Sequence, residues 1–381
     1  MYLLFIIAVV FAIFLNTNIG EAIGLTHKTA VSFLPMMVYI ALTLLTQKMR
    51  YNKIAIYLLI LAVIILLLKW SIGQDYIVII GQLLVIPMLM FICFDRLTRR
   101  QSSTLRRLML LFFIVFCALA IVEKAFNYHF FPLAVETEKH DLSIGVFRSY
   151  SFFEHHLISS YFVTIFMSFV SIAHFQKKYS QIFLFFLGYI ALFCFDGRGA
   201  IIIVTLILLP YFLWKLHKTV EKKRWMFNLG VICMLFGLVY LISETSLGNG
   251  RLTNANARLM DSSAETRLDV FNFYKYYNKH DDFIWGRSDN SLDMAGKLGA
   301  AGVENSIIEF IMLYGIIFAP ILLLLLFLLQ YKSLSVYKKH DKLVILLTFW
   351  GLGNMSPLLA APIIWILWIF TYYSFKPDIL R

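Results

Sequence analysis

The sequence predicts an all-α membrane protein, a polytopic bundle of about 12 transmembrane helices. Of the 381 residues, 60% are hydrophobic and only 15% are charged, which is too little charge to cover the surface of a soluble globular protein. Apolar runs of about 20 residues, the length that crosses a bilayer as a helix, recur along the whole chain. We therefore expect a single integral membrane domain, residues 1–381, with one large polar loop at residues 244–303.

Twelve apolar runs are predicted to form the spans. Their ranges are 2–19, 29–46, 54–72, 76–94, 108–126, 153–175, 181–195, 199–215, 226–243, 305–330, 343–357 and 359–375. Several runs are short or adjoin the next one, so any count from ten to twelve agrees with the pattern. The first run has no basic segment before it and no small-residue cleavage site after it, and we expect it to be retained as a span.

Basic residues mark one face of the predicted bundle. They concentrate in the loops after the even-numbered spans and in the tail, at 48–53, 96–107, 177–178, 215–224, 332–342 and 376–381. Because positively charged loops stay in the cytoplasm, both termini are expected inside the cell, and segments 127–152 and 244–303 outside. In a bacterium this places the chain in the inner (plasma) membrane. The net charge of +12 follows from this topology and from contact with anionic membrane lipids, and we do not expect a nucleic-acid partner.

The cysteines give no sign of a metal centre. Cys93, Cys117, Cys194 and Cys233 all lie inside apolar runs and lack the spacing of zinc ligands. We therefore expect no disulfide framework, no metal and no other cofactor.

An arginine lies on the turn Asp196-Gly197-Arg198-Gly199-Ala200, which separates two predicted spans on the external face. The glycines permit unusual backbone angles and a close approach of the backbone to a ligand. An arginine in the middle of a membrane costs about 2.5–3.5 kcal/mol, so Arg198 should face a polar cavity or the interface. The alternative is a simple hairpin in which Arg198 pairs with Asp196.

A second arginine lies in the external loop, where residues 264–279 have the apolar spacing of an amphipathic helix. Ser262 or Ser263 is the expected N-cap. Arg267 falls in the first turn, where the helix dipole disfavours a cation. An anion beside Arg267 would explain its position, and a solvated surface arginine is the alternative.

Two further polar clusters lie at the outer ends of spans. Glu304, followed by Asn305, begins a long apolar span, and Glu304 is expected to act either as a helix cap or as a general base at the membrane surface. The other cluster runs from Arg148 to His156. Its adjacent His155 and His156 are expected on different helix faces, which argues against a shared metal site. One of them could line a cavity, or the whole cluster could be interfacial.

The order of these features resembles the O-antigen polymerase and ligase family, the Wzy-type enzymes. The resemblance depends on the Gly-Arg-Gly-Ala turn at 197–200, the external loop with its arginine helix at 264–279, Trp285-Gly286, and Glu304-Asn305 ahead of a helix that contains Gly315. The apolar pattern extends the likeness over most of the chain. The ligase branch has a histidine before the asparagine, so Glu304 resembles the polymerase branch more closely.

The resemblance implies a glycosyltransferase that acts at the outer face of the inner membrane. It would polymerise oligosaccharide units linked to undecaprenyl diphosphate into O-antigen or a related surface polysaccharide, without metal or nucleotide. Donor and acceptor lipids would be its partners, together with a chain-length-regulating co-polymerase. An O-antigen ligase that transfers glycan to the lipid A core is the alternative, and a membrane transporter or flippase is the alternative from another class.

The implied roles can be assigned by residue. Arg198 and Arg267 would neutralise the diphosphate, and Glu304 would accept the proton of the acceptor hydroxyl. Tyr274 and Trp285 are expected to stack on sugars. The remaining candidates for contact with the substrate are Arg148, His155, Arg258, Arg287 and Asn305.

Overall fold

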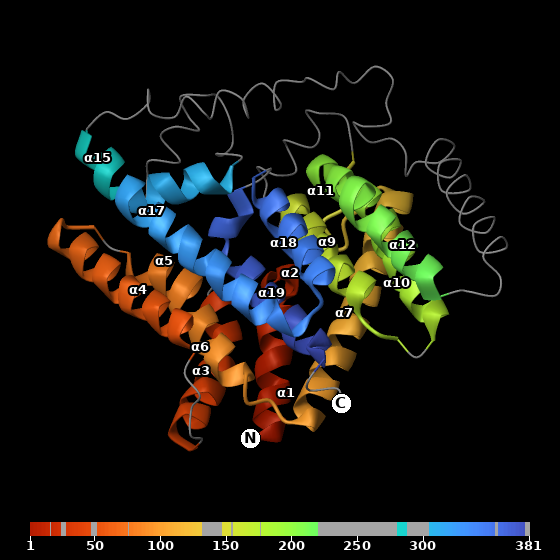
Figure 1. Cartoon of the computed structure of the whole chain (residues 1–381), viewed down its shortest axis with the longest axis horizontal. Helices are drawn as coiled ribbons and strands as arrows, with labels where there is room; N and C mark the ends of the chain where they lie inside the picture. The colour runs from red at the N-terminus through yellow and green to blue at the C-terminus, as the bar shows by residue number, and fades with distance from the viewer. Residues whose placement is uncertain are drawn as a thin grey trace. The chain divides into compact units, whose positions relative to one another are not determined.

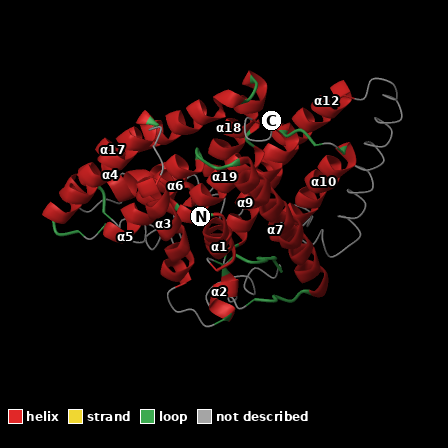
Figure 2. Cartoon of the chain, turned by 90° about the horizontal axis from the view of Figure 1, so that it is seen from below, coloured by secondary structure: helices red, strands yellow, loops and turns green. Residues whose placement is uncertain are grey.

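The computed structural model describes most of the apolar helices of the chain. The described residues are 1–15, 17–23, 28–46, 52–74, 76–131, 147–153, 155–175, 177–219, 280–287, 305–354 and 357–377. Within these ranges every regular element is helical, as the predicted fold class requires (Figure 2).

Six helical segments of the described chain are long and apolar enough to cross a membrane, which agrees with a membrane protein. They are Lys53–Ser71, Ile77–Phe94, Arg99–Phe126, Lys178–Phe195, Arg198–Lys218 and Ser306–Val336. Shorter apolar helices cover Tyr2–Phe14, Ser32–Thr46, His156–Ile172 and Pro362–Phe375. Predicted span 226–243 lies outside the described residues, and the total of twelve spans stays a prediction.

The packing divides the chain into two compact units. Unit 1 comprises Met1–Ala12, Ser32–Arg107 and Met260–Arg381, and unit 2 comprises Ile13–Val31 and Leu108–Leu259. Helix α7 (Arg99–Phe126) runs from one unit into the other.

Unit 1 contains the N-terminal and C-terminal helices (Figure 1). In chain order its helices are α1 (Tyr2–Val10), α3 (Lys28–Thr46), α4 (Lys53–Ser71), α5 (Ile77–Ile80), α6 (Ile86–Phe94), α15 (His280–Trp285), α17 (Ser306–Ser333), α18 (Lys339–Gly353) and α19 (Pro362–Phe375). A π-helical segment, η2 (Gly81–Val85), joins α5 to α6. Two short 3₁₀ helices, η6 (Leu334–Val336) and η7 (Pro357–Ala360), flank α18.

The core of unit 1 is an aromatic cluster around α19. Trp365, Trp368, Tyr372 and Tyr373 are all almost fully buried, and the rings of Trp368 and Tyr372 stack at 5.3 Å. Aromatic side chains bury much apolar area with few rotatable bonds, so this cluster holds α19 rigidly in the core of unit 1.

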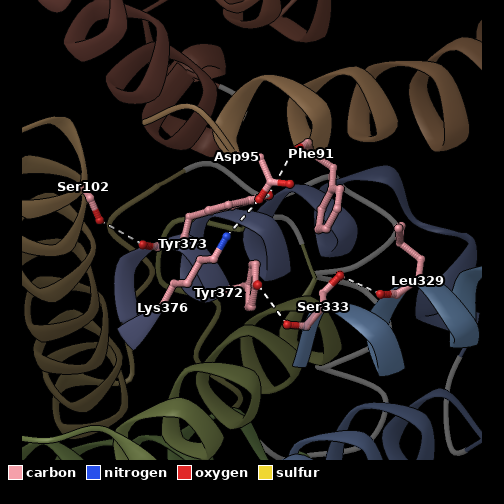
Figure 3. A network of polar contacts seen from close by, with 8 residues as sticks. All are labelled: Phe91, Asp95, Ser102, Leu329, Ser333, Tyr372, Tyr373 and Lys376. Carbon is pink, nitrogen blue, oxygen red and sulfur yellow. Dashed lines mark hydrogen bonds and ion pairs between the residues drawn. The ribbon is translucent and has the colours of Figure 1, made fainter. Parts of the chain in front are cut away.

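Polar contacts tie the end of α19 to the ends of its neighbours (Figure 3). The Tyr373 hydroxyl lies 2.9 Å from both the Phe91 carbonyl oxygen and Asp95 Oδ1, and Lys376 Nζ lies 2.9 Å from the same Asp95 oxygen. The Tyr372 hydroxyl donates to the Ser333 carbonyl oxygen at 3.0 Å. These bonds join α6, α17 and α19 at the end where the sequence predicts the cytoplasmic face.

Helix α7 begins at Arg99, nine residues before the predicted span 108–126. A reciprocal capping pair explains the extension: the Thr98 N–H donates to Gln101 Oε1 at 2.9 Å, and the Gln101 N–H donates to Thr98 Oγ1 at 3.3 Å. The added turns carry arginines that the apolar pattern left outside the span.

After α7, unit 2 contains three helical segments that pack against one another, and Phe113 of α7 stacks on Phe166 of the first of them. They are α9 (His156–Ile172), α10 (Lys178–Phe195) and the continuous segment α11 (Arg198–Ile203), η3 (Val204–Leu208) and α12 (Leu209–Thr219). Gly188 of α10 lets the helices approach closely, because a Cβ there would lie 2.8 Å from Met167 Sδ and 2.9 Å from Phe113 Cζ. Small residues at helix contacts are typical of membrane bundles.

Candidate functional site

The Arg198 turn, residues 196–198, connects α10 to α11 in unit 2. Asp196 ends α10 in the left-handed conformation, with φ of 53°, which is uncommon for a residue with a Cβ. Gly197 follows, and a Cβ at this position would overlap the Ser160 side chain of α9. Arg198 then begins α11 and is half-buried. The sequence therefore folds into a turn whose backbone is constrained at the two residues before the arginine.

Arg148 holds this turn from inside the unit. Its Nε lies 3.6 Å from Asp196 Oδ2, and both side chains are buried. Its Nη1 lies 3.5 Å from Nε2 of His156. Breaking a buried ion pair by removing one partner costs about 3–5 kcal/mol. Arg148, which we expected to contact substrate, is thus placed to support the turn.

The expectation that His155 and His156 lie on different helix faces was wrong. Their rings stack at 4.6 Å with an interplanar angle of 23°. His155 is the N-cap of α9 with an extended backbone, and its Nδ1 accepts the Leu157 N–H at 3.1 Å. Because a cap residue lies outside the helix, the helical-face argument does not apply to it. No group of three metal-ligating side chains occurs among the described residues.

Two charged residues at the end of α7, Glu123 and Lys124, organise the segment before α9. Both are about 1% exposed. Glu123 Oε2 accepts the N–H groups of Tyr150 at 3.0 Å and Ser151 at 2.9 Å, and Lys124 donates to the Phe147 carbonyl oxygen. The two residues were not among the predicted site residues, although adjacent charges at the end of an apolar run were a usable signal.

His129 makes the fold of this segment sensitive to pH. Burial lowers the pKa of His129 to about 4, whereas an unperturbed histidine has a pKa of about 6.5. Between these values the unfolded chain binds a proton that the folded chain does not, so stability present above pH ~6.5 is lost as the pH falls toward ~4. The ring stacks on Phe147 at 4.4 Å, an arrangement that phenylalanine can reproduce.

We expect His129→Phe to reduce the acid sensitivity of the protein. The measurement is the thermal unfolding midpoint in detergent at pH 7.5 and pH 5.0. The wild type should lose more stability than the variant between the two values, because the variant lacks the titrating ring. An equal loss of stability in both proteins would contradict the conclusion that His129 causes the acid sensitivity.

In unit 1, helix α17 is broken at Gly315, which has φ of 75° and ψ of 168°. A helix that stops leaves the carbonyls of its last turn without intrahelical donors, and two of these carbonyls find other partners here. The Met312 carbonyl oxygen accepts the Arg287 N–H at 2.8 Å. The Leu313 carbonyl oxygen accepts the Tyr76 hydroxyl at 2.9 Å.

The segment after α15 fits into this break, and Figure 1 shows α15 beside α17. Gly286 has φ of 73°, and a Cβ there would overlap the backbone of Leu313 and Gly315. Trp285, expected to stack on sugars, keeps 37% of its surface exposed and lies 6.2 Å from the Phe318 ring. Arg287 is half-buried, and its backbone is anchored by the Met312 bond.

Asn305 acts as the N-cap of α17. Its Oδ1 accepts the N–H groups of Ile307 at 3.0 Å and Ile308 at 3.1 Å, and its Nδ2 donates to the Asn354 carbonyl oxygen at 3.3 Å. Asparagine is among the best N-caps. The asparagine therefore makes the cap contacts that sequence analysis offered as one role for Glu304.

The predicted site residues fall into three groups. Arg148, His155 and Arg198 come together in unit 2, and Trp285 and Arg287 lie at the break in unit 1, with Asn305 at the start of α17. The others, Arg258, Arg267, Tyr274 and Glu304, lie outside the described residues, as do residues 264–279 with their expected serine cap. Comparison with protein-family models, curated proteins and solved structures found no match.

Proposed function

We propose that the protein is a membrane glycosyltransferase that polymerises oligosaccharide units carried on undecaprenyl diphosphate at the outer face of a bacterial inner membrane. The observation that carries this proposal is the Arg198 turn, which presents a half-buried arginine between two apolar helices. The turn packs on Ser160 through Gly197 and is tied to Arg148 through Asp196. An arginine at such a position is expected to face a polar group. A diphosphate that enters with its lipid tail between helices would be a suitable polar group.

Guanidinium chemistry favours a phosphate ligand for this turn. A planar fork of N–H donors binds phosphate oxygens in pairs, which a lysine cannot do. Arg148 is buried in its ion pair with Asp196, whereas Arg198 is only half-buried, so we assign the diphosphate to Arg198. The preorganised backbone keeps the cation in place while negative charge develops on the leaving group.

In the proposed reaction, the donor sugar is transferred from the lipid diphosphate to the hydroxyl group of the acceptor. The acceptor hydroxyl oxygen forms a bond to C1 of the donor sugar, and the bond from C1 to the phosphate oxygen breaks. The electron pair leaves with undecaprenyl diphosphate, whose charge Arg198 and the sequence-assigned Arg267 neutralise. The hydroxyl proton goes to the Glu304 carboxylate, a contribution of about 10²–10⁴-fold for a general base. Trp285 is exposed enough to stack on a sugar.

A transporter is the second candidate, and the break in α17 is the observation that favours it. Carriers often bind substrates at discontinuous helices near the middle of the membrane. Here the residues of α4 and its following turn that contact the break region, Lys69 and Tyr76, lie at or just beyond the C-terminal end of α4. This position near a helix end supports an interfacial element better than a mid-membrane site. Substrate flux through the Arg198→Ala chain would favour transport.

Deletion of the gene in its host tests the proposed function directly. Surface glycan on a gel should then show lipid A core that carries a single repeat unit, and the wild-type gene should restore long chains. Bare core would instead indicate a ligase, and loss of a capsule would indicate a different product. Unchanged surface glycan would contradict the proposal.

The proposal requires the end of α7 to lie outside the cell and the start of α10 to lie inside. Tyr128 and Tyr179 mark these places and are 61% and 85% exposed. In a chain without its native cysteines, we expect a membrane-impermeant maleimide to label Tyr128→Cys in intact cells and Tyr179→Cys only after permeabilisation. The reverse pattern would place the Arg198 turn on the wrong side for a lipid-linked donor.

A further inference from the structure

Two stacked histidines, His155 and His156, lie at the start of α9. Both side chains are half-buried, and their ring centres are 4.6 Å apart. Imidazole is the side chain whose charge ordinarily changes between about pH 5 and pH 8. Two imidazolium cations at this distance would repel each other, so the stacked arrangement favours a pair in which at least one ring is neutral.

The cap that His155 makes on α9 requires an unprotonated ring nitrogen. Its Nδ1 accepts the Leu157 N–H at 3.1 Å, and an imidazole that carries protons on both nitrogens has no acceptor left. A cation at this position is also opposed by the helix dipole, which is positive at the N-terminus. Protonation of His155 would therefore remove the cap.

The contact between His156 and Arg148 also favours a neutral ring. His156 Nε2 lies 3.5 Å from Arg148 Nη1, and because an arginine can only donate, the histidine nitrogen must be the acceptor. The Tyr150 ring packs against His156 in a T-shaped arrangement, with 5.8 Å between the ring centres. Protonation of His156 would therefore set a second cation directly beside Arg148.

The neighbouring elements bring further titratable and charged groups to this end of unit 2. Among the described residues they are Glu123 and Lys124 of α7, His129 after α7, Asp196 of α10 and Arg198 of α11. Both carboxylates are already engaged, since Asp196 lies 3.6 Å from Arg148 and Glu123 accepts two backbone N–H groups. Glu154, which precedes the pair in the sequence, lies outside the described residues. Among the described groups, a proton on either ring thus adds charge beside cations.

The start of α9 is coupled to the Arg198 turn. The Ser160 hydroxyl donates to the His156 carbonyl oxygen at 2.9 Å, and the same side chain fills the space beside Gly197. The Arg198 N–H in turn donates to the Asp196 carbonyl oxygen at 3.1 Å. A first turn of α9 that loosens would therefore release the packing that supports the turn.

We propose that His155 and His156 form a pH-sensitive switch, which loosens the start of α9 and the adjoining Arg198 turn when the surrounding solution becomes acidic. Both contacts need neutral rings, so the closed arrangement binds fewer protons than the loosened one. Its stability is therefore present at neutral pH and is lost as the pH falls. The switch goes beyond the proposed glycosyl transfer and does not depend on it.

The test measures backbone amide exchange of the full chain in nanodiscs at pH 7.5 and pH 5.5, as protection relative to the intrinsic rate at each pH. Every chain carries His129→Phe, which removes the other expected acid response. We expect the amides of residues 157–160 to lose about fivefold in protection at pH 5.5, the effect of losing one N-cap. The amides of residues 198–201 should lose protection with them, whereas those in the middle of α10 should not.

Neutral replacements separate the histidines from other groups. His155→Asn combined with His156→Gln removes both titrating rings and keeps an oxygen acceptor at each position. This double variant should match its parent at pH 7.5 and keep its protection at pH 5.5, and each single variant should remove part of the acid response. His174→Gln is the matched control, because His174 is exposed just beyond the opposite end of α9. It should respond to pH as its parent does.

Three results would overturn the inference. The first is equal protection of residues 157–160 in the parent chain at the two pH values. The second is a double variant that still loses protection at pH 5.5, which would assign the response to another group. The third is an equal loss of protection throughout the described helices of unit 2, which would indicate general acid unfolding instead of a local switch.

Discussion

Replacing Arg198 with alanine is expected to lower glycan transfer by about 10²–10³-fold, the loss typical of removing one preorganised donor from a developing negative charge. Arg198→Lys should retain part of the activity, because it keeps the charge but loses the planar fork. The measurement is the amount and length of surface glycan when each variant complements the deleted gene. Membrane levels of each variant should be matched by immunoblot.

Arg107→Ala is the control for this substitution. Arg107 is an exposed arginine near the start of α7, where the sequence predicts the cytoplasmic face, so its loss should leave glycan length unchanged. Wild-type glycan from the Arg198→Ala chain would show that the turn does not carry the diphosphate. A joint loss in Arg198→Ala and Arg107→Ala would point to a general effect of surface charge.

Gly315→Ala is expected to cause a large loss of stability in unit 1. The φ and ψ of Gly315 fall in a region that is nearly restricted to glycine, at a cost of about 1–3 kcal/mol for other residues. A Cβ there would also overlap the Ile284 carbonyl group, and overpacking adds about 1–3 kcal/mol. The thermal unfolding midpoint in detergent should fall by several degrees, and segment 284–287 should become accessible to protease.

Gly81→Ala provides a matched comparison within the same unit. Gly81 lies in η2, and a Cβ there would meet no atom within 4 Å. We expect this variant to unfold at the wild-type temperature or slightly above it, because alanine reduces the freedom of the unfolded chain. A Gly315→Ala chain as stable as Gly81→Ala would mean that the break in α17 is not a fixed feature of the fold.

The helices were predictable because a bilayer imposes a simple rule on the sequence. Apolar runs long enough to cross it coincide with described helices in both units, for example 54–72 with α4 and 181–195 with α10. Helix ends were less predictable, since they depend on caps. Thr98 and Gln101 extend α7 beyond its apolar run, whereas α17 begins at its Asn305 cap, where the predicted span 305–330 also begins.

The site was predictable only in part, because its supporting contacts join residues far apart in the chain. The Gly197-Arg198 turn was recognisable from its glycines. The ion pair between Arg148 and Asp196, in contrast, joins two residues that α9 and α10 separate in the sequence. Lys69 and Trp285 are separated by more than 200 residues. No local pattern relates such positions, so the bond between Lys69 Nζ and the Trp285 carbonyl oxygen emerged only from the packed structure.

The most direct test of the account is the affinity of the purified full chain for undecaprenyl diphosphate compared with undecaprenyl monophosphate. The two lipids share a tail, so any preference isolates recognition of the second phosphate. The account predicts at least about a tenfold preference for the diphosphate in the wild type and its loss in Arg198→Ala. Equal affinity of the wild type for the two lipids would contradict it.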